Sequence, residues 1–144
     1  AQSQTHGYQC GESIMKRIIL TLIIIFISVT SFAYVTWVTI ASNDEVEILF
    51  QGKAGSFTFD ETENGKPVAV LTGRVVTSES IKFEKWYVSA TDCKNGYGTL
   101  YTLNLDNEYL YDNSFVFDGG NISSTIAKMI CLIAEEELKD RDII

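Results

Sequence analysis

Histidine, cysteine and basic residues are scarce in this chain of 144 residues. The one histidine is His6, near the start, so the long remainder of the chain cannot form a Ser-His or Cys-His catalytic pair. There are 11 Lys and Arg residues against 19 Asp and Glu residues, which gives a formal net charge of −8. A chain this acidic lacks the basic surface on which nucleic-acid binding depends. The composition therefore excludes histidine-dependent nucleophilic catalysis and argues against nucleic acid as a partner.

A signal peptide is predicted at residues 15–33. Lys16 and Arg17 precede an apolar run, residues 18–29, and the small residues Ser31 and Ala33 on either side of Phe32 meet the requirement of a signal peptidase for cleavage after Ala33. The alternative is a retained membrane anchor, because residues 18–43 carry no charge and are long enough to cross a bilayer. The second half of that stretch is rich in β-branched and aromatic residues, which favours a strand and hence cleavage. We expect a periplasmic or secreted protein that meets the membrane only through its signal peptide.

The predicted signal also sets the domain organisation. Residues 1–14 precede Met15, the natural start of such a signal, and are interpreted as a non-native or upstream read-through segment. Residues 34–144 form one α+β domain, with a net charge of about −9 once Glu12, Lys16 and Arg17 are removed. A domain of this size buries only a modest hydrophobic core, so a covalent cross-link would add noticeably to its stability.

Two cysteines remain after residue 33, Cys93 and Cys131. An exported protein folds in an oxidising compartment, so a disulfide between them is expected. Closing a loop of about 38 residues would stabilise the fold by roughly 3 to 4 kcal/mol on the chain-entropy model. The alternative is a reactive or metal-binding thiol, which the lack of a nearby histidine and of a Cys-x-x-Cys spacing disfavours.

Alternation of apolar and polar residues dominates the middle of the chain. Turn residues recur about every 8 to 14 positions between β-branched and aromatic runs, which is typical of an antiparallel sheet. In the run 81–90, Phe83 and Lys85 share one face while Glu84 and Trp86 share the other. Residues 91–96 are interpreted as a turn. The strands expected from this pattern are 34–41, 45–51, 57–59, 68–77, 81–90, 97–105 and 109–117.

The end of the chain changes to helical spacing. Apolar residues recur at i, i+3, i+4 and i+7, namely Ile126, Met129, Ile130 and Ile133. Asn121 or the segment 123–125 supplies an N-cap, and Gly119-Gly120 is interpreted as a hinge into the helix. The three acids 135–137 should fray its C-terminal end, because negative charge there opposes the helix dipole. The predicted fold is thus an antiparallel β-sheet meander with a C-terminal helix packed on it.

No group of residues points to catalysis, a metal or a cofactor. The acids early in the domain are interpreted as a solvated face: Asp44, Glu45, Glu47, Asp60, Glu61 and Glu63. The short acidic turn 106–108 lacks the number of ligands that a calcium loop needs. We therefore expect no metal site, no cofactor and no enzymatic activity.

Aromatic residues are more numerous than a core of this size requires. Tyrosine and tryptophan on a sheet face are favoured contact residues in protein recognition, whereas the alternative role is core and cross-strand packing. The candidate binding residues are Trp86, Tyr87, Tyr97, Tyr101, Tyr109 and Tyr111.

The segment 88–133 resembles the C-terminal half of the surface-adhesin protein E family of small exported bacterial proteins. The resemblance rests on the pair Asp92-Cys93 and on Cys131 within the terminal helix, with Trp37 matching a tryptophan of an early strand. It implies an antiparallel sheet with a packed helix and a bridge between the two cysteines. For the named member it also implies attachment to host extracellular-matrix and plasma proteins.

These observations lead to a functional prediction with one alternative. We expect an exported, adhesin-like, non-catalytic protein-binding module whose partner is a protein such as a host matrix protein, with homodimerisation as a further option. The alternative is a periplasmic inhibitor or immunity protein, in which the acidic surface masks a basic enzyme or toxin.

Overall fold

The structure is a computed structural model that describes residues 34–142. The expected signal peptide at 15–33, its cleavage after Ala33 and the segment 1–14 lie outside the described residues. The fold below belongs to the unit Val35–Ile144.

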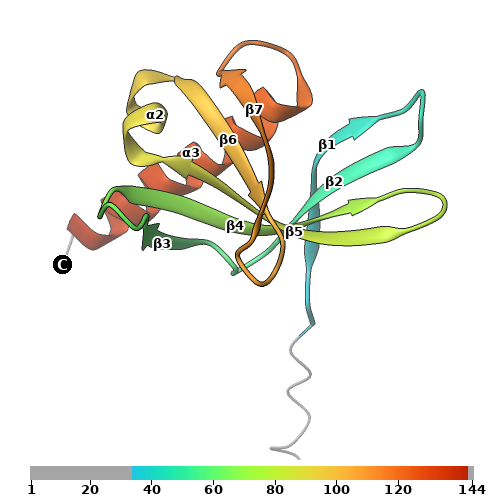
Figure 1. The fold of residues 1–144 in the computed structure, drawn as a ribbon, viewed down its shortest axis with the longest axis horizontal. Helices are drawn as coiled ribbons and strands as arrows, with labels where there is room; N and C mark the ends of the chain where they lie inside the picture. The colour runs from blue at the N-terminus through green and yellow to red at the C-terminus, as the bar shows by residue number, and fades with distance from the viewer. Residues whose placement is uncertain (1–33, 143–144) are drawn as a thin grey trace, which may run out of the picture. The chain divides into compact units, whose positions relative to one another are not determined.

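Strands alternate with turns until the last part of the chain (Figure 1). Neither helix in the described part is both long and apolar enough to cross a membrane. The order within residues 34–142 is β1 (Trp37–Asn43), β2 (Ile48–Lys53), β3 (Thr58–Glu61), β4 (Pro67–Val76), β5 (Ile81–Ser89), α2 (Ala90–Asn95), β6 (Tyr97–Leu103), β7 (Tyr109–Val116) and α3 (Ile122–Asp142).

The strands form one antiparallel sheet with the order β1-β2-β4-β5-β6-β7, and β3 pairs with β4 beside this path. β2 lies opposite 73–76 and β3 opposite 67–70, so the two short strands follow one another along the same edge of β4. The strand expected at 45–51 begins only at Ile48, because residues 44–47 form the turn between β1 and β2. This sheet, with α3 packed on it, confirms the predicted α+β meander (Figure 1).

The hydrophobic core lies between α3 and one face of the sheet. Trp86 and Val88 on β5 face the core, and their partners across the β4–β5 ladder are Leu71 and Ala69. The buried face of α3 consists of Ser124, Ile126, Ala127, Ile130, Cys131 and Ala134. Ala127 is small, which lets the helix backbone approach the sheet closely. Complete burial of a side chain such as Ile130 contributes roughly 1.5 to 3 kcal/mol.

α3 extends further than we expected from the acidic residues near its C-terminal end. Asn121 caps it as expected, because its Oδ1 accepts a hydrogen bond of 2.8 Å from the backbone N–H of Ser124. The predicted fraying at 135–137 is wrong, since the helix continues to Asp142. Lys139 lies 3.1 Å from Glu135 and 3.3 Å from Glu136, and Arg141 adds a second positive charge to the last turn. These cations oppose the unfavourable effect of the acids on the helix dipole.

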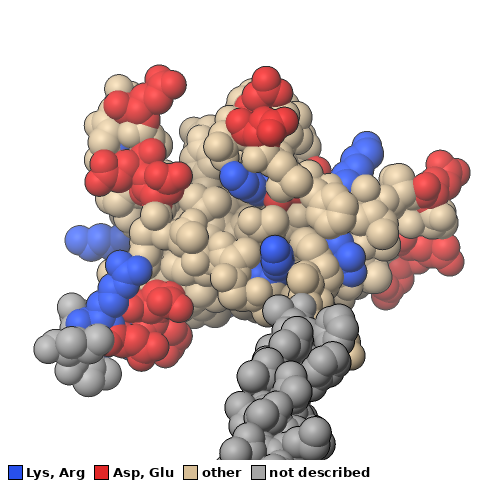
Figure 2. All heavy atoms as spheres, turned by 90° about the horizontal axis from the view of Figure 1, so that it is seen from below, with Lys and Arg blue, Asp and Glu red and all other residues tan. Residues whose placement is uncertain are grey.

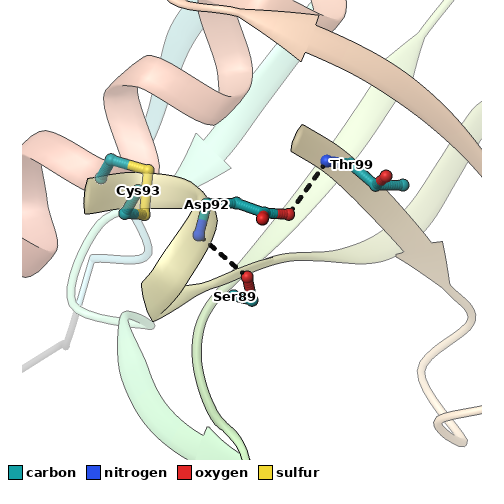
Figure 3. The surroundings of a disulfide bond; sticks show 5 residues. Ser89, Asp92, Cys93 and Thr99 are labelled. Carbon is teal, nitrogen blue, oxygen red and sulfur yellow. Dashed lines mark hydrogen bonds between the residues drawn. A yellow bond between two sulfur atoms is a disulfide. The ribbon is translucent and has the colours of Figure 1, made fainter. Parts of the chain in front are cut away.

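The segment 91–96, predicted as a turn, belongs to the short helix α2 (Figure 3). The Ser89 hydroxyl accepts a hydrogen bond of 3.0 Å from the Asp92 N–H and caps its start. Gly96 ends it in the left-handed conformation, with φ of 77°. The Asp92 carboxylate accepts a hydrogen bond from the Thr99 N–H, which ties α2 to β6. A turn and a single helical turn use the same residue types, so sequence could not separate them.

The expected disulfide joins Cys93 on α2 to Cys131 on α3, with 5.3 Å between the two Cα atoms (Figure 3). The bond links positions 38 residues apart. It therefore fastens α2, the connection between β5 and β6, to the helix that covers the sheet.

Candidate functional site

One face of the sheet carries no helix. α3 packs on the face that holds Trp86, and the alternate side chains point to the opposite side, which we call the open face. The register of the ladders places the following residues on the open face: Trp37, Thr72, Arg74, Phe83, Lys85, Tyr87, Tyr101, Leu103, Tyr109 and Asp112. Their side chains are half-buried or exposed. The open face is thus the large sheet surface that remains available for contacts within the described residues.

A pair of stacked tyrosines lies at the middle of the open face. Tyr87 on β5 is directly opposite Tyr101 on β6, and their rings are parallel within 10° with centroids 4.8 Å apart. Stacking of this kind fixes both rings, so little conformational entropy is lost when a partner packs on them. Burial, followed by the charges of Tyr101 and Asp112, raises the pKa of Tyr87. Tyr87 therefore stays uncharged at neutral pH.

Tyr109 extends this aromatic surface onto β7. Its side chain is 59% exposed, and its hydroxyl donates a hydrogen bond of 2.8 Å to Oδ2 of Asp112. That hydrogen bond is the main reason why the pKa of Tyr109 is raised. The ring is held in place by a polar contact while its apolar surface faces solvent, which is a common arrangement at protein interfaces.

A second aromatic cluster occupies the other end of the open face. Trp37 on β1 packs against Phe83 on β5, with ring centroids 5.8 Å apart. The Arg74 guanidinium lies 4.4 Å from the centroid of the Trp37 ring, and its Nε donates a hydrogen bond of 2.7 Å to Gln51. The cluster thus joins strands β1, β2, β4 and β5.

Between β3 and the β6–β7 turn the open face is hollowed into a groove of about 740 Å³. Its floor is formed by Val68, Val70, Thr72, Lys85, Tyr87 and Leu103, and its walls by Ser56, Thr58, 60–64, Asn107 and Tyr109. Asp60, Glu61 and Glu63 are among the lining residues, at β3 and the turn that follows it. Lys85 is the one cation among the lining residues, and its Nζ donates a hydrogen bond of 2.7 Å to Oδ1 of Asn107.

Charge is unevenly distributed over the surface. Seen from below, acidic side chains gather at the projecting ends of the molecule, whereas several basic side chains lie nearer the middle of the view (Figure 2). The ion pairs found within the described residues join Lys128 to Asp118 and Lys139 to Glu135 and Glu136. The acids on the groove wall take part in none of these pairs, so their charge is available to a partner.

The six candidate binding residues do not form one surface. Tyr87, Tyr101 and Tyr109 come together on the open face. Tyr97 is 62% exposed but lies at the far end of β6, beside α2. Trp86 is 1% exposed, which corrects its nomination as a contact residue, because a side chain buried beneath α3 cannot touch a partner.

Tyr111 belongs to the opposite face of the sheet. Its hydroxyl lies 3.3 Å from both oxygens of Glu84, a carboxylate that is only 6% exposed. The second donor to Glu84 is the indole Nε1 of Trp86, at 3.0 Å. Burial and then the Glu84 charge raise the pKa of Tyr111. We infer that Tyr111, Glu84 and Trp86 stabilise the edge of the core, since their polar atoms form hydrogen bonds with one another.

Sequence reasoning did not select Phe83, Arg74 or the acids of the groove wall. Strand parity places Phe83 on the same face of β5 as Lys85 and Tyr87, but it does not tell which face α3 covers. The acids could not be selected from the sequence, because their place in the groove depends on how β3 and its turn lie beside the β6–β7 turn.

Comparison with known proteins gives no family. No family model, no curated protein and no solved structure matches the chain. Residues 34–142 also hold no group of three or more His, Cys, Asp or Glu side chains arranged to bind a metal ion. The open face, with its two aromatic clusters and its groove, is therefore the candidate functional site.

Proposed function

We propose that the protein is an exported, non-catalytic binding module that holds a protein partner on the open face of its sheet. The observation that carries this proposal is the row formed by Tyr87, Tyr101 and Tyr109 on a sheet face without a helix. Each ring is fixed by stacking or by a hydrogen bond, and each keeps apolar surface toward solvent.

Preorganised aromatic surface is what protein interfaces use most effectively. Tyrosine is enriched where partners bury their contact residues, and two fixed rings lose less entropy on binding than flexible side chains do. The second cluster, Trp37 with Phe83 and Arg74, lies on the same face. Tryptophan and arginine are the other residue types that dominate binding energy at interfaces.

Export remains part of the proposal. The disulfide between Cys93 and Cys131 supports it, because such bonds persist in oxidising compartments. The adhesin-like role rests on the resemblance to the surface-adhesin protein E family, with a host matrix protein as one partner of the right class.

The acidic wall of the groove favours a second candidate function. Asp60 and Glu63 lie beside the tyrosine row, where they would attract a basic surface. A periplasmic inhibitor or immunity protein that masks a basic enzyme or toxin would use the same face in this way.

A capture experiment tests the open face as the binding surface. The double variant Tyr87→Ser, Tyr101→Ser is compared with the wild-type protein for retention of proteins from the exported fraction of its own source. The matched control, Met129→Ser with Leu132→Ser, removes two exposed apolar side chains from α3. We expect the control to retain the partner and the tyrosine variant to lose it. Equal retention by all three proteins would refute the proposal.

A further inference from the structure

The groove on the open face is lined by side chains suited to binding a positively charged peptide segment. Its floor is apolar along β4 and aromatic at Tyr87, while Asp60 and Glu63 contribute acidic side chains at β3 and the turn after it. Glu61 also lines the groove, but it pairs with Pro67 and so points to the other face of β3 from Asp60, which pairs with Val68. An occupant must therefore offer methylene groups to the floor and positive charge to the wall. Lysine and arginine side chains combine both features.

The acidic side chains at the wall of the groove are exposed to solvent. One oxygen of Asp60 accepts a hydrogen bond of 2.8 Å from the Glu61 N–H, and the side chains of all three acids are exposed. Among the described residues no lysine or arginine lies within ion-pair distance of them. Neighbouring negative charges without a counter-charge repel one another, and a bound cation relieves that repulsion.

The single cation of the groove is turned to the opposite wall. Lys85 projects from the floor, and its hydrogen bond to Asn107 holds its ammonium group at the β6–β7 turn. The negative potential at the β3 wall is thus only partly cancelled. Tyr109, beside Asn107, presents a ring on which a second cationic side chain can lie.

We propose that this groove binds an extended, lysine- or arginine-bearing segment of the partner protein, with the cationic side chains at Asp60 and Glu63. This inference rests on the proposed function and specifies the partner's chemistry. A volume of about 740 Å³, open along the sheet, accommodates a short extended segment rather than a folded domain.

The test uses two capped decapeptides as probes, one with five Lys-Thr repeats and one with five Gln-Thr repeats. Amide resonances of the ¹⁵N-labelled protein are followed while each peptide is added at low ionic strength. We expect saturable shifts from the lysine peptide at β3, its turn and 103–109, and no saturable shifts from the glutamine peptide. Shifts of similar size at every acidic turn would overturn the proposal, and so would an absence of saturable binding.

Matched variants separate the groove from general attraction to an acidic protein. The triple variant Asp60→Asn, Glu61→Gln, Glu63→Gln is compared with Asp44→Asn, Glu45→Gln, Glu47→Gln, which has the same residue types and spacing on the β1–β2 turn. We expect the groove variant to weaken binding of the lysine peptide about tenfold and the control variant less than about twofold. An equal loss in both variants would contradict the proposal.

Removal of the groove's own cation provides a gain-of-binding test that poor folding cannot mimic. The variant Lys85→Met should bind the lysine peptide about threefold more tightly, because a like charge is removed. Weaker binding of the lysine peptide by this variant would count against the groove as the binding site. If the tyrosine variant loses the captured partner and the triple groove variant retains it fully, the partner's contact is not cationic, and the proposed binding function stands without this inference.

Discussion

Trp86 fills the space above Gly73. A Cβ atom built on Gly73 would overlap ring carbons of the indole. The backbone of Gly73 is not in the left-handed region, so packing rather than conformation requires glycine here. The contact lets the indole lie flat beneath α3, with its Nε1 aimed at Glu84.

The variant Gly73→Ala should disturb this packing. Inserting a methyl group into a filled core forces side chains out of their preferred rotamers, and we expect a loss of about 1 to 3 kcal/mol in the free energy of unfolding. Urea denaturation measures the loss, and a changed near-UV spectrum of tryptophan should accompany it. Gly55→Ala serves as the control, because nothing lies within 4 Å of a Cβ there and only the backbone is strained. An unchanged spectrum in Gly73→Ala would show that the ring is not confined as described.

Loss of the disulfide should destabilise the fold without changing its architecture. The double variant Cys93→Ala, Cys131→Ala opens a loop of 38 residues, and we expect a loss of roughly 3 to 4 kcal/mol. Reducing agent should lower the urea midpoint of the wild-type protein and leave that of the variant unchanged. A wild-type midpoint that ignores reductant would contradict the structural role of the bond.

We expect Glu84 to stabilise the fold as a hydrogen-bond acceptor rather than through its negative charge. Glu84→Leu leaves the indole N–H of Trp86 without its acceptor and should cost about 1 to 3 kcal/mol. Glu84→Gln keeps an acceptor oxygen and avoids a buried charge, so its stability at pH 7 should be at least equal to that of the wild type. Both values follow from urea denaturation. A glutamine variant as unstable as the leucine variant would require a role for the negative charge.

Stability should decline at alkaline pH because of the half-buried tyrosines. The pKa values of Tyr87 and Tyr111 are raised above the usual 10.0, so the unfolded chain loses these protons first as the pH rises. Deprotonation then favours the unfolded state: the stability is fully present below about pH 10 and falls as the pH approaches the raised values. Thermal unfolding between pH 8 and pH 11 measures this dependence, and Tyr111→Phe should make it shallower. A midpoint that rises over this range would reverse the assigned direction.

The sheet and its faces were predictable from residue alternation. Strand parity placed Glu84 and Trp86 opposite Phe83 and Lys85, as the structure has them. The disulfide followed from the presence of two cysteines in the predicted domain. Local pattern sufficed in these cases because strand geometry and cysteine number leave few alternatives.

The choice between the two faces was not predictable. Residues 86–88 are apolar or aromatic on both sides of β5, so alternation alone does not tell whether Trp86 or Tyr87 is exposed. Only the docking of α3 decides that Trp86 is buried and Tyr87 is not. The groove likewise depends on β3 and the β6–β7 turn, which are distant in sequence.

Site-specific photo-crosslinking tests the open face most directly. A photoreactive phenylalanine analogue is placed at position 101 on the open face or at position 132 on the exposed side of α3, and the protein is irradiated in the exported fraction of its source. We predict a discrete covalent adduct with another protein from position 101 and none from position 132. An adduct from position 132 alone would contradict the assignment of the open face as the binding surface.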